Sequence, residues 1–292
     1  MDGIILINKE KKYTSHDVVA KVKKILKVKV GHTGTLDPNA TGILPLLLGN
    51  ATKISKYLIN HNKEYIAELK LGVKTDTADG EGKVIAEKQV NLEEIFENIN
   101  ESIQQILNSF VGKTLQKPPM YSAIKVNGKK LYEYARRGQE VELKPRQIEI
   151  YSIQLVGINE KEKQISFKVK CSKGTYIRSL CEDISKKLGT VGYMKELNRL
   201  QVGEFYIKDA VTISEMKEKI EAGNLESIIT IEEIFKNNPQ IQLEQEQIEP
   251  YINGVKINTE KTNGVYRIYK PNGTFIGLGI IENSKLKRDL VI

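Results

Sequence analysis

The stretch VGHTGTLDPNATGILPLLLGNATK, residues 30–53, is the most distinctive part of this 292-residue chain. Residues 31–49 contain four glycines and two prolines, so we expect a shaped loop rather than a regular element. The apolar run at 43–48 then leads into a helix near 51–58. Asp37 lies inside the loop, directly before a proline. Taken alone, this spacing favours an Asx-turn aspartate over a catalytic one.

Strand and helix signals alternate along the rest of the chain. Strand signals occur at 4–7, 65–71, 83–87, 148–156, 164–171 and 203–206. Helical spacing predicts helices after an N-cap at Thr14 or Ser15 and near 92–110, 176–188 and 214–222. Composition turns to Asn, Gln and Pro near 237–239, so we predict a main domain at 1–238 and a small β domain at 239–292.

The charge of the chain favours a polyanionic partner. Its net charge of +8 and pI of about 9.1 would attract phosphates, although charge alone is weak evidence. Residues 113–146 are the most basic stretch, with nine Lys or Arg against three Glu and three interleaved tyrosines. The apolar patch at 4–7 is too short for a signal peptide or a membrane span, so we expect a cytoplasmic protein without a membrane partner.

Several common chemistries have no support in the sequence. No glycine loop is followed by a Walker lysine and no dinucleotide fingerprint is present, so we predict no cofactor. The histidines lack metal-ligand spacing, so no metal site is predicted; they are His16, His32 and His61. Asp76 and Asp79 lie in an acidic turn without the ligand pattern of a calcium loop, so turn chemistry explains them.

Residues 30–53 closely resemble the signature of the TruB-type bacterial tRNA pseudouridine-55 synthases, in which the aspartate of G-x-L-D-P is catalytic. Three further blocks are similar and follow in the same order: KEYIAELKLGVKTDTADGEG (63–82), QKPPMYSAIKVNGKKLYEYARRG (116–138) and GTYIRSLCEDISKKLG (174–189). The resemblance covers most of residues 3–208, including LNRL at 197–200. It implies an α+β fold with a mixed, mainly antiparallel central sheet and flanking helices, plus a PUA-like C-terminal domain.

The resemblance also implies roles for individual residues. Asp37 would be the catalytic carboxylate, Arg178 its ion-pair partner, and Tyr65 the ring that stacks on the target base. As a catalytic residue, Tyr65 could also help to remove the C5 proton. His32 would fill the gap left by that base. Without the family blocks, Tyr65 could be a core residue, Arg178 a helix-surface arginine and His32 a loop cap.

Further residues would contact the substrate. Tyr176 and Leu197 would line the uracil pocket, although Leu197 could equally be core. Lys9 is retained from the family pattern and expected on the substrate side, but the family's Lys-Pro is Lys9-Glu10 here, which puts packing support for the loop in doubt. The basic stretch would grip phosphates through five residues: Lys125, Lys129, Lys130, Arg136 and Arg137.

The implied reaction isomerises one uridine in the T loop of tRNA after flipping it out of the stack. No redox agent or energy source is needed, because the net composition of the base is unchanged. The partner would be the tRNA T stem-loop, with no obligatory protein partner and a monomeric enzyme. Two alternatives stay open: a non-catalytic RNA-binding module, and the guide-RNA-dependent branch of the same superfamily.

Overall fold

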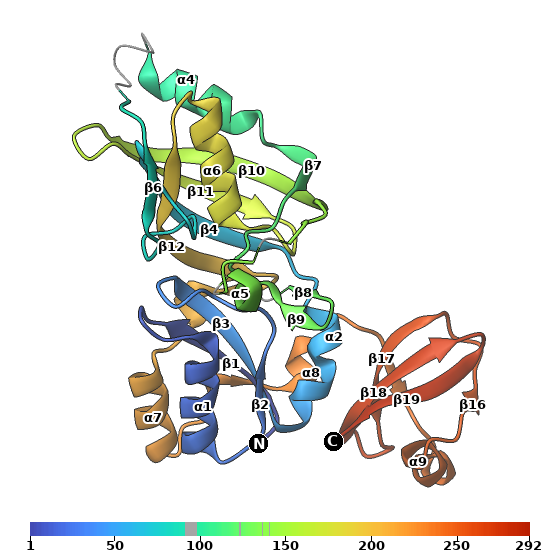
Figure 1. Cartoon of the computed structure of the whole chain (residues 1–292). Helices are drawn as coiled ribbons and strands as arrows, with labels where there is room; N and C mark the ends of the chain where they lie inside the picture. The colour runs from blue at the N-terminus through green and yellow to red at the C-terminus, as the bar shows by residue number, and fades with distance from the viewer. Residues whose placement is uncertain (91–97, 123, 136, 140) are drawn as a thin grey trace.

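A large mixed sheet organises the chain in the computed structural model, which describes residues 1–90, 98–122, 124–135, 137–139 and 141–292. The ten-stranded sheet has the order β14-β1-β3-β12-β4-β11-β10-β7, with β2 paired to β3 and β13 to β12 (Figure 1). Its strands are Gly3–Lys9 (β1), Val30–His32 (β2), Thr41–Leu48 (β3), Lys63–Leu71 (β4), Gly112–Gln116 (β7), Arg146–Asn159 (β10), Gln164–Cys171 (β11), Gly192–Val202 (β12), Phe205–Tyr206 (β13) and Ile228–Ile229 (β14). Among the strands described in this sheet, only β3 and β12 pair in parallel, which confirms the predicted fold class.

The helices lie around this sheet. They are Ser15–Leu26 (α1), Ser55–Leu58 (α2), Ile99–Asn108 (α4), Leu131–Ala135 (α5), Ile177–Lys187 (α6), Ile213–Glu221 (α7), Ile231–Ile234 (α8) and Gln245–Ile252 (α9), with 3-10 turns at Gly49–Ile54 and Ile207–Asp209. Thr14 caps α1 as predicted, because its side chain accepts a hydrogen bond from the Asp17 amide. The first part of the helix predicted at 92–110 lies outside the described residues, and the rest is α4. No helix in the described part of the chain is long and apolar enough to cross a bilayer.

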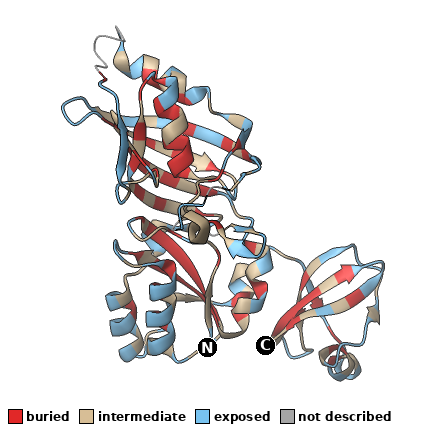
Figure 2. Ribbon diagram, viewed as in Figure 1, coloured by how far each residue is buried: buried red, intermediate tan, exposed pale blue. Residues whose placement is uncertain are grey.

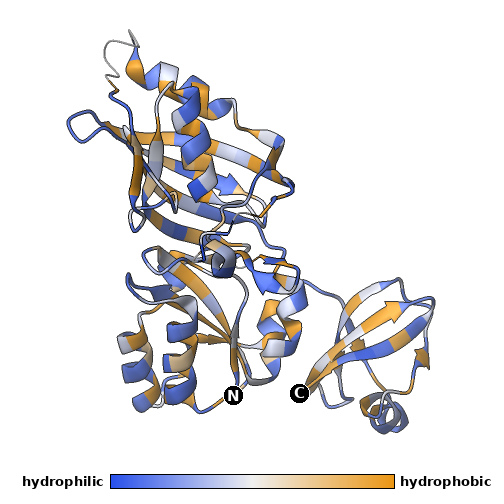
Figure 3. Ribbon diagram, viewed as in Figure 1, coloured by the Kyte–Doolittle hydropathy of each residue, from blue (hydrophilic) through white to orange (hydrophobic). Residues whose placement is uncertain are grey.

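Three apolar core clusters stabilise the main sheet, two of them formed by its own strands and flanking helices. The alternating residues of β4 point their buried set toward α6, where Tyr65, Ala67 and Leu69 join one core (Figure 2). In the other half, β1 and β3 pack against α1 and α7, and Figure 3 shows these strands as mostly hydrophobic and the outer side of α1 as hydrophilic. The loop that carries Asp37 connects β2 to β3, and β3 meets β12 of the other half directly after this loop, at residues 41–42.

The structure corrects the predicted loop at 31–49. Only residues 33–40 are irregular, because Thr41–Leu48 forms β3 and its residues 42–48 pair with β1. On the edge of β3 away from β1, β12 pairs with residues 41–42 and β2 with residues 46–48. Pro45 lies between these two pairings, so the strand tolerates a residue that has no amide hydrogen to donate. The glycine and proline content therefore predicted too long a loop, whereas the apolar run at 43–48 forms part of strand β3.

Residues 240–291 form a second, five-stranded sheet beside α9. Its strands are Gln240–Gln242 (β15), Ile257–Asn258 (β16), Gly264–Tyr269 (β17), Phe275–Glu282 (β18) and Lys285–Val291 (β19). Leu278 and Leu290 of this sheet join a core cluster with Ile4 and Ile43 of the main sheet. Two small hairpins complete the fold: Val73–Thr75 (β5) with Val84–Glu87 (β6), and Lys125–Val126 (β8) with Lys129–Lys130 (β9).

Candidate active site

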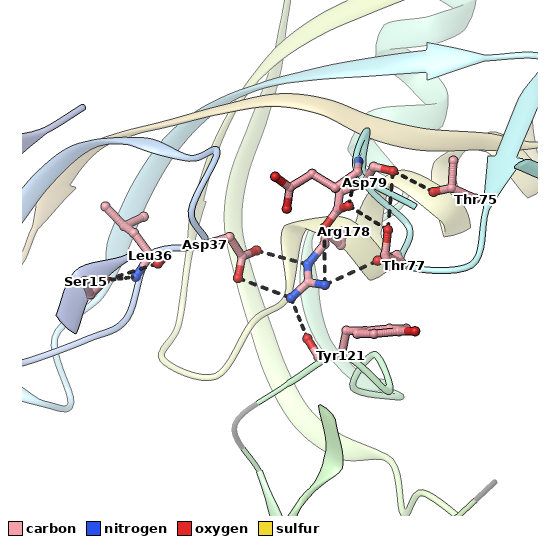
Figure 4. Close-up of polar contacts among 9 residues, drawn as sticks. Ser15, Leu36, Asp37, Thr75, Thr77, Asp79, Tyr121 and Arg178 are labelled. Atoms are coloured by element: carbon pink, nitrogen blue, oxygen red, sulfur yellow. Dashed lines mark hydrogen bonds and ion pairs between the residues drawn. The ribbon is translucent and has the colours of Figure 1, made fainter. Parts of the chain in front are cut away.

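The loop at 33–40 is fastened to the start of α1. Ser15 is buried, and its hydroxyl accepts a hydrogen bond from the Leu36 amide at 2.8 Å and donates one to the Leu36 carbonyl at 3.1 Å (Figure 4). The Asp37 carbonyl accepts from the Ala40 amide at 3.1 Å, which closes a turn around the proline. The backbone on both sides of the Asp37 side chain is therefore held before any substrate binds.

Lys9 of β1 supports the same loop through its ammonium group. It is 1% exposed, and its ammonium donates to the carbonyls of Glu10 at 2.9 Å, Tyr13 at 2.7 Å and Pro38 at 2.9 Å. All three ammonium hydrogens are thus used by the protein itself. This placement corrects the expectation that Lys9 contacts the substrate: its side chain holds the Asp37 loop, and it does so with Glu10 at the position of the family proline.

The fold brings together Asp37 of the 30–53 motif and Arg178 of the 174–189 block. The Arg178 Nε lies 3.0 Å from Asp37 Oδ2, and its Nη2 lies 3.3 Å from Oδ1 (Figure 4). Burial raises the pKa of the Asp37 carboxyl, while the guanidinium opposes this rise. The carboxylate keeps 37% of its side-chain surface exposed, whereas the arginine keeps 6%. The ion pair therefore exposes a charged Asp37 oxygen to the cavity, while the arginine that holds it stays buried and fixed.

Asp79 is a member of this cluster that the sequence interpretation missed. Its Oδ2 lies 3.5 Å from Arg178 Nη1, and its Oδ1 accepts from the Thr77 hydroxyl at 2.6 Å. Arg178 also donates to the carbonyls of Thr77 and Tyr121, at 3.3 and 2.8 Å. Turn chemistry alone is therefore too narrow an account of Asp79, which also helps to fix the arginine. Its place in the 63–82 block was the available signal.

A cavity of about 1070 Å³ opens above this ion pair. Its lining includes most of the residues expected from the family pattern: His32, Asp37, Tyr65, Tyr176, Arg178 and Leu197. Tyr65 and Leu197 are each 8% exposed and belong to the apolar core, and both also line the cavity. The wall is thus apolar on the side of the sheet and charged at its base, which suits a flat heterocycle attached to a sugar.

Two buried cations next to Tyr65 were also missed. Arg199 of β12 contacts the Tyr65 hydroxyl, and Lys63 of β4 donates to the His61 carbonyl at 2.7 Å. Burial raises the pKa of Tyr65 to about 12, an effect that Arg199 opposes, and burial lowers the pKa of Lys63 to about 8. Hydropathy patterns place charged residues on the surface, so only the LNRL block at 197–200 pointed to Arg199.

His32 lies at the end of β2 on the cavity wall. Its ring meets the His16 ring edge to face at 5.5 Å between centroids, and its buried Nδ1 has no hydrogen-bond partner among the described residues. Burial lowers the pKa of His32, which favours the uncharged ring. An uncharged aromatic ring at the mouth of a cavity can stack on a nucleobase.

The basic stretch at 113–146 begins inside the main sheet, because its first strand, β7, pairs with β10. Lys125, Lys129 and Lys130 lie on the β8–β9 hairpin, and Lys130 lines the cavity. Arg137 is exposed beyond α5, whereas Arg136 lies outside the described residues. Within the part of the chain that is described, no cluster of three His, Cys, Asp or Glu side chains is arranged to hold a metal ion.

Comparisons with known proteins agree with this geometry. Family profiles match residues 22–177 (TruB family pseudouridylate synthase, N-terminal domain), 178–235 (tRNA pseudouridylate synthase B C-terminal domain) and 239–288 (pseudouridine synthase II TruB, C-terminal). A relative from Clostridium kluyveri named tRNA pseudouridine synthase B is 45% identical, covering 98% of both chains. One of the same name from Clostridium tetani is 44% identical over 96% of this chain and 95% of its own.

Solved structures share the fold. A Cbf5-Nop10-Gar1 complex contains a chain with a TM-score of 0.66 and 26% identity, covering 99% of this chain and 83% of that one. An archaeal box H/ACA Nop10-Cbf5 complex gives a TM-score of 0.67 at 24% identity, which shows likeness of fold alone. With profiles and relatives spanning almost its whole length, the chain belongs to the TruB family of pseudouridylate synthases, as its motifs predicted.

Proposed function

We propose that this chain isomerises one uridine in the T loop of tRNA to pseudouridine, with Asp37 as the catalytic carboxylate. The broader activity, a tRNA pseudouridine synthase, accords with the names of relatives that align over nearly the whole chain. The observation that carries the proposal is the Asp37–Arg178 ion pair at the base of the cavity, beside the Tyr65 ring.

The reaction breaks the bond between ribose C1′ and uracil N1, turns the base and joins C1′ to C5. Positive charge develops on the sugar as the first bond breaks, and a carboxylate can stabilise that charge, attack C1′ or remove the C2′ proton. Asp37 can do any of these only when it is ionised. Arg178 favours the ionised form and fixes its direction through two contacts.

The uridine has to leave the T-loop stack to reach Asp37, at a cost of a few kcal/mol. Tyr65 against the extracted uracil and His32 in the vacated gap would offset this, since stacking on an aromatic ring contributes about 1–3 kcal/mol per base. Tyr176 and Leu197 would close the sides of the uracil pocket, because both line the same cavity.

Binding of the T stem would use the basic hairpin. Lys125 and Lys129 are exposed on β8–β9, and Lys130 connects the hairpin to the cavity. We assign residues 1–238 to the catalytic domain and 239–292 to a PUA-like domain that contacts tRNA beyond the T loop. On this proposal the enzyme works as a monomer in the cytoplasm, without an obligatory protein partner.

Incubation of the purified chain with a T stem-loop transcript, without cofactor or guide RNA, tests the proposal. Mass-resolved mapping should find one T-loop uridine converted, and no conversion when that uridine is replaced by cytidine. Binding without conversion would favour the non-catalytic RNA-binding module. Conversion that requires a guide RNA and added proteins would favour the guide-dependent branch.

A further inference from the structure

Arg199 is a buried cation without an acidic partner. It is 1% exposed in the middle of β12 and is among the largest fully buried side chains described. Among the described residues no carboxylate forms an ion pair with it, in contrast to Arg178, which has Asp37 and Asp79. Burying a charge without a counter-ion costs several kcal/mol, and an apolar residue of similar size would be more stable there. Stability of the sheet therefore does not explain an arginine here.

The contacts of Arg199 join three separate parts of the active site. Its Nε donates to the Ile43 carbonyl of β3 at 2.8 Å, and its Nη2 donates to the Gly34 carbonyl at 3.2 Å. Its guanidinium also lies in contact with the Tyr65 hydroxyl, since Tyr65 is the cross-strand neighbour of Arg199. Gly34 is at the start of the loop that carries Asp37, so one planar group connects that loop, the strand after it and the ring expected to stack on uracil.

The sheet places Arg199 where these contacts meet. In the strand register Arg199 lies opposite Tyr65 of β4 on one side and opposite Gly42 of β3 on the other. Gly42 has a φ of +106°, and a Cβ at that position would lie 2.3 Å from the Arg199 carbonyl oxygen. A side chain at residue 42 would therefore push the two strands apart. The close approach of β3 and β12 lets a single guanidinium reach both halves of the sheet.

We propose that Arg199 is a positioning residue that fixes the Tyr65 ring relative to the loop carrying Asp37. The inference rests on the proposed function of the same cavity. Lysine cannot reproduce these contacts, because its single nitrogen cannot occupy both the Nε position facing Ile43 and the Nη2 position facing Gly34. Arg199 borders the cavity but is only 1% exposed, so it is expected to act on the chemical step through Tyr65 rather than on tRNA affinity.

The test compares Arg199→Lys, Tyr65→Phe and the double variant in single-turnover and steady-state assays on the T stem-loop transcript. Arg199→Lys should lower kcat by about 100-fold, the loss expected from misplacement by about 1 Å, with KM little changed. In the Tyr65→Phe background the same substitution should cost far less, because the contact it breaks is already absent. Wild-type conversion is measured first, so failure of the proposed function would be seen separately.

Arg267→Lys is a matched control in the second sheet. Arg267 also donates to a carbonyl, that of Asn238 at 3.1 Å, and to a tyrosine hydroxyl, that of Tyr269 at 3.0 Å, but it lines no part of the cavity. Its variant should keep the wild-type kcat. The proposal is overturned if Arg199→Lys keeps that kcat, or loses the same factor with and without the Tyr65 hydroxyl. If Arg199→Lys fails to fold, Tyr65→Phe alone decides: it breaks the same contact, and an unchanged kcat contradicts the proposal.

Discussion

Arg178 meets Asp37 through two nearly parallel contacts, 3.0 Å from Nε to Oδ2 and 3.3 Å from Nη2 to Oδ1. The two residues are 141 positions apart in the chain, and each is held by its own set of backbone hydrogen bonds. Pair geometry of this kind favours the ionised carboxylate and leaves it little freedom to turn. The pH dependence of the reaction should therefore report on this pair.

Arg178→Gln should move the acid limb of the kcat profile to higher pH. Asp37 is active as the carboxylate, so the rate falls as pH drops through its pKa. Burial already raises that pKa and Arg178 opposes the rise, so loss of the guanidinium raises the pKa further. The measurement is the single-turnover rate constant as a function of pH, with Arg267→Gln as the control. An acid limb that stays in place would contradict the assigned electrostatics.

Asp79→Asn should shift the same limb in the opposite direction. The Asp79 carboxylate adds to the rise in the Asp37 pKa, so its neutralisation lowers that pKa and moves the acid limb to lower pH. At neutral pH the variant should still lose activity, because Arg178 loses one of its anchors. A shift toward higher pH would show that Asp79 acts mainly by orienting Arg178 rather than through its charge.

Lys9→Met should reduce kcat and stability while leaving KM almost unchanged. The substitution removes the ammonium that bonds the Glu10 and Tyr13 carbonyls, and each unsatisfied buried group costs about 1–3 kcal/mol. The loop bearing Asp37 would also lose the Lys9 contact at Pro38, whose carbonyl would keep only the Lys12 amide at 3.0 Å. Thermal unfolding and steady-state kinetics measure both effects. A raised KM with an intact kcat would restore the substrate-binding role expected from the sequence.

The hairpin β8–β9 should account for part of the salt dependence of tRNA binding. Lys125→Glu with Lys129→Glu should weaken binding and make the plot of log affinity against log salt shallower by about one to two, the contribution of two phosphate contacts. Lys217→Glu with Lys219→Glu is the matched control, because both lysines are exposed on α7, which lines no part of the cavity. Equal effects of the two pairs would show that net charge, not the hairpin, governs binding.

Much of this site could be predicted because its residues lie in long, characteristic motifs. Asp37, Tyr65 and Arg178 were named from the sequence, and the fold brings them to one cavity. The missed features have physical causes. Hydropathy patterns do not identify β12, because polar residues interrupt its sequence and the buried Arg199 occupies a position where an apolar residue is expected. Lys9 is a surface residue by type, and only the loop carbonyls around it reveal why it is buried.

The conversion of T-loop uridine by Asp37→Asn tests the central claim most directly. The asparagine is nearly isosteric but cannot carry the charge or attack the sugar, so no pseudouridine should form even at high enzyme concentration and long times. Binding of the T stem-loop, followed by fluorescence on the same preparation, should stay measurable because the basic hairpin is untouched. Pseudouridine formed by this variant at the wild-type rate would contradict the claim.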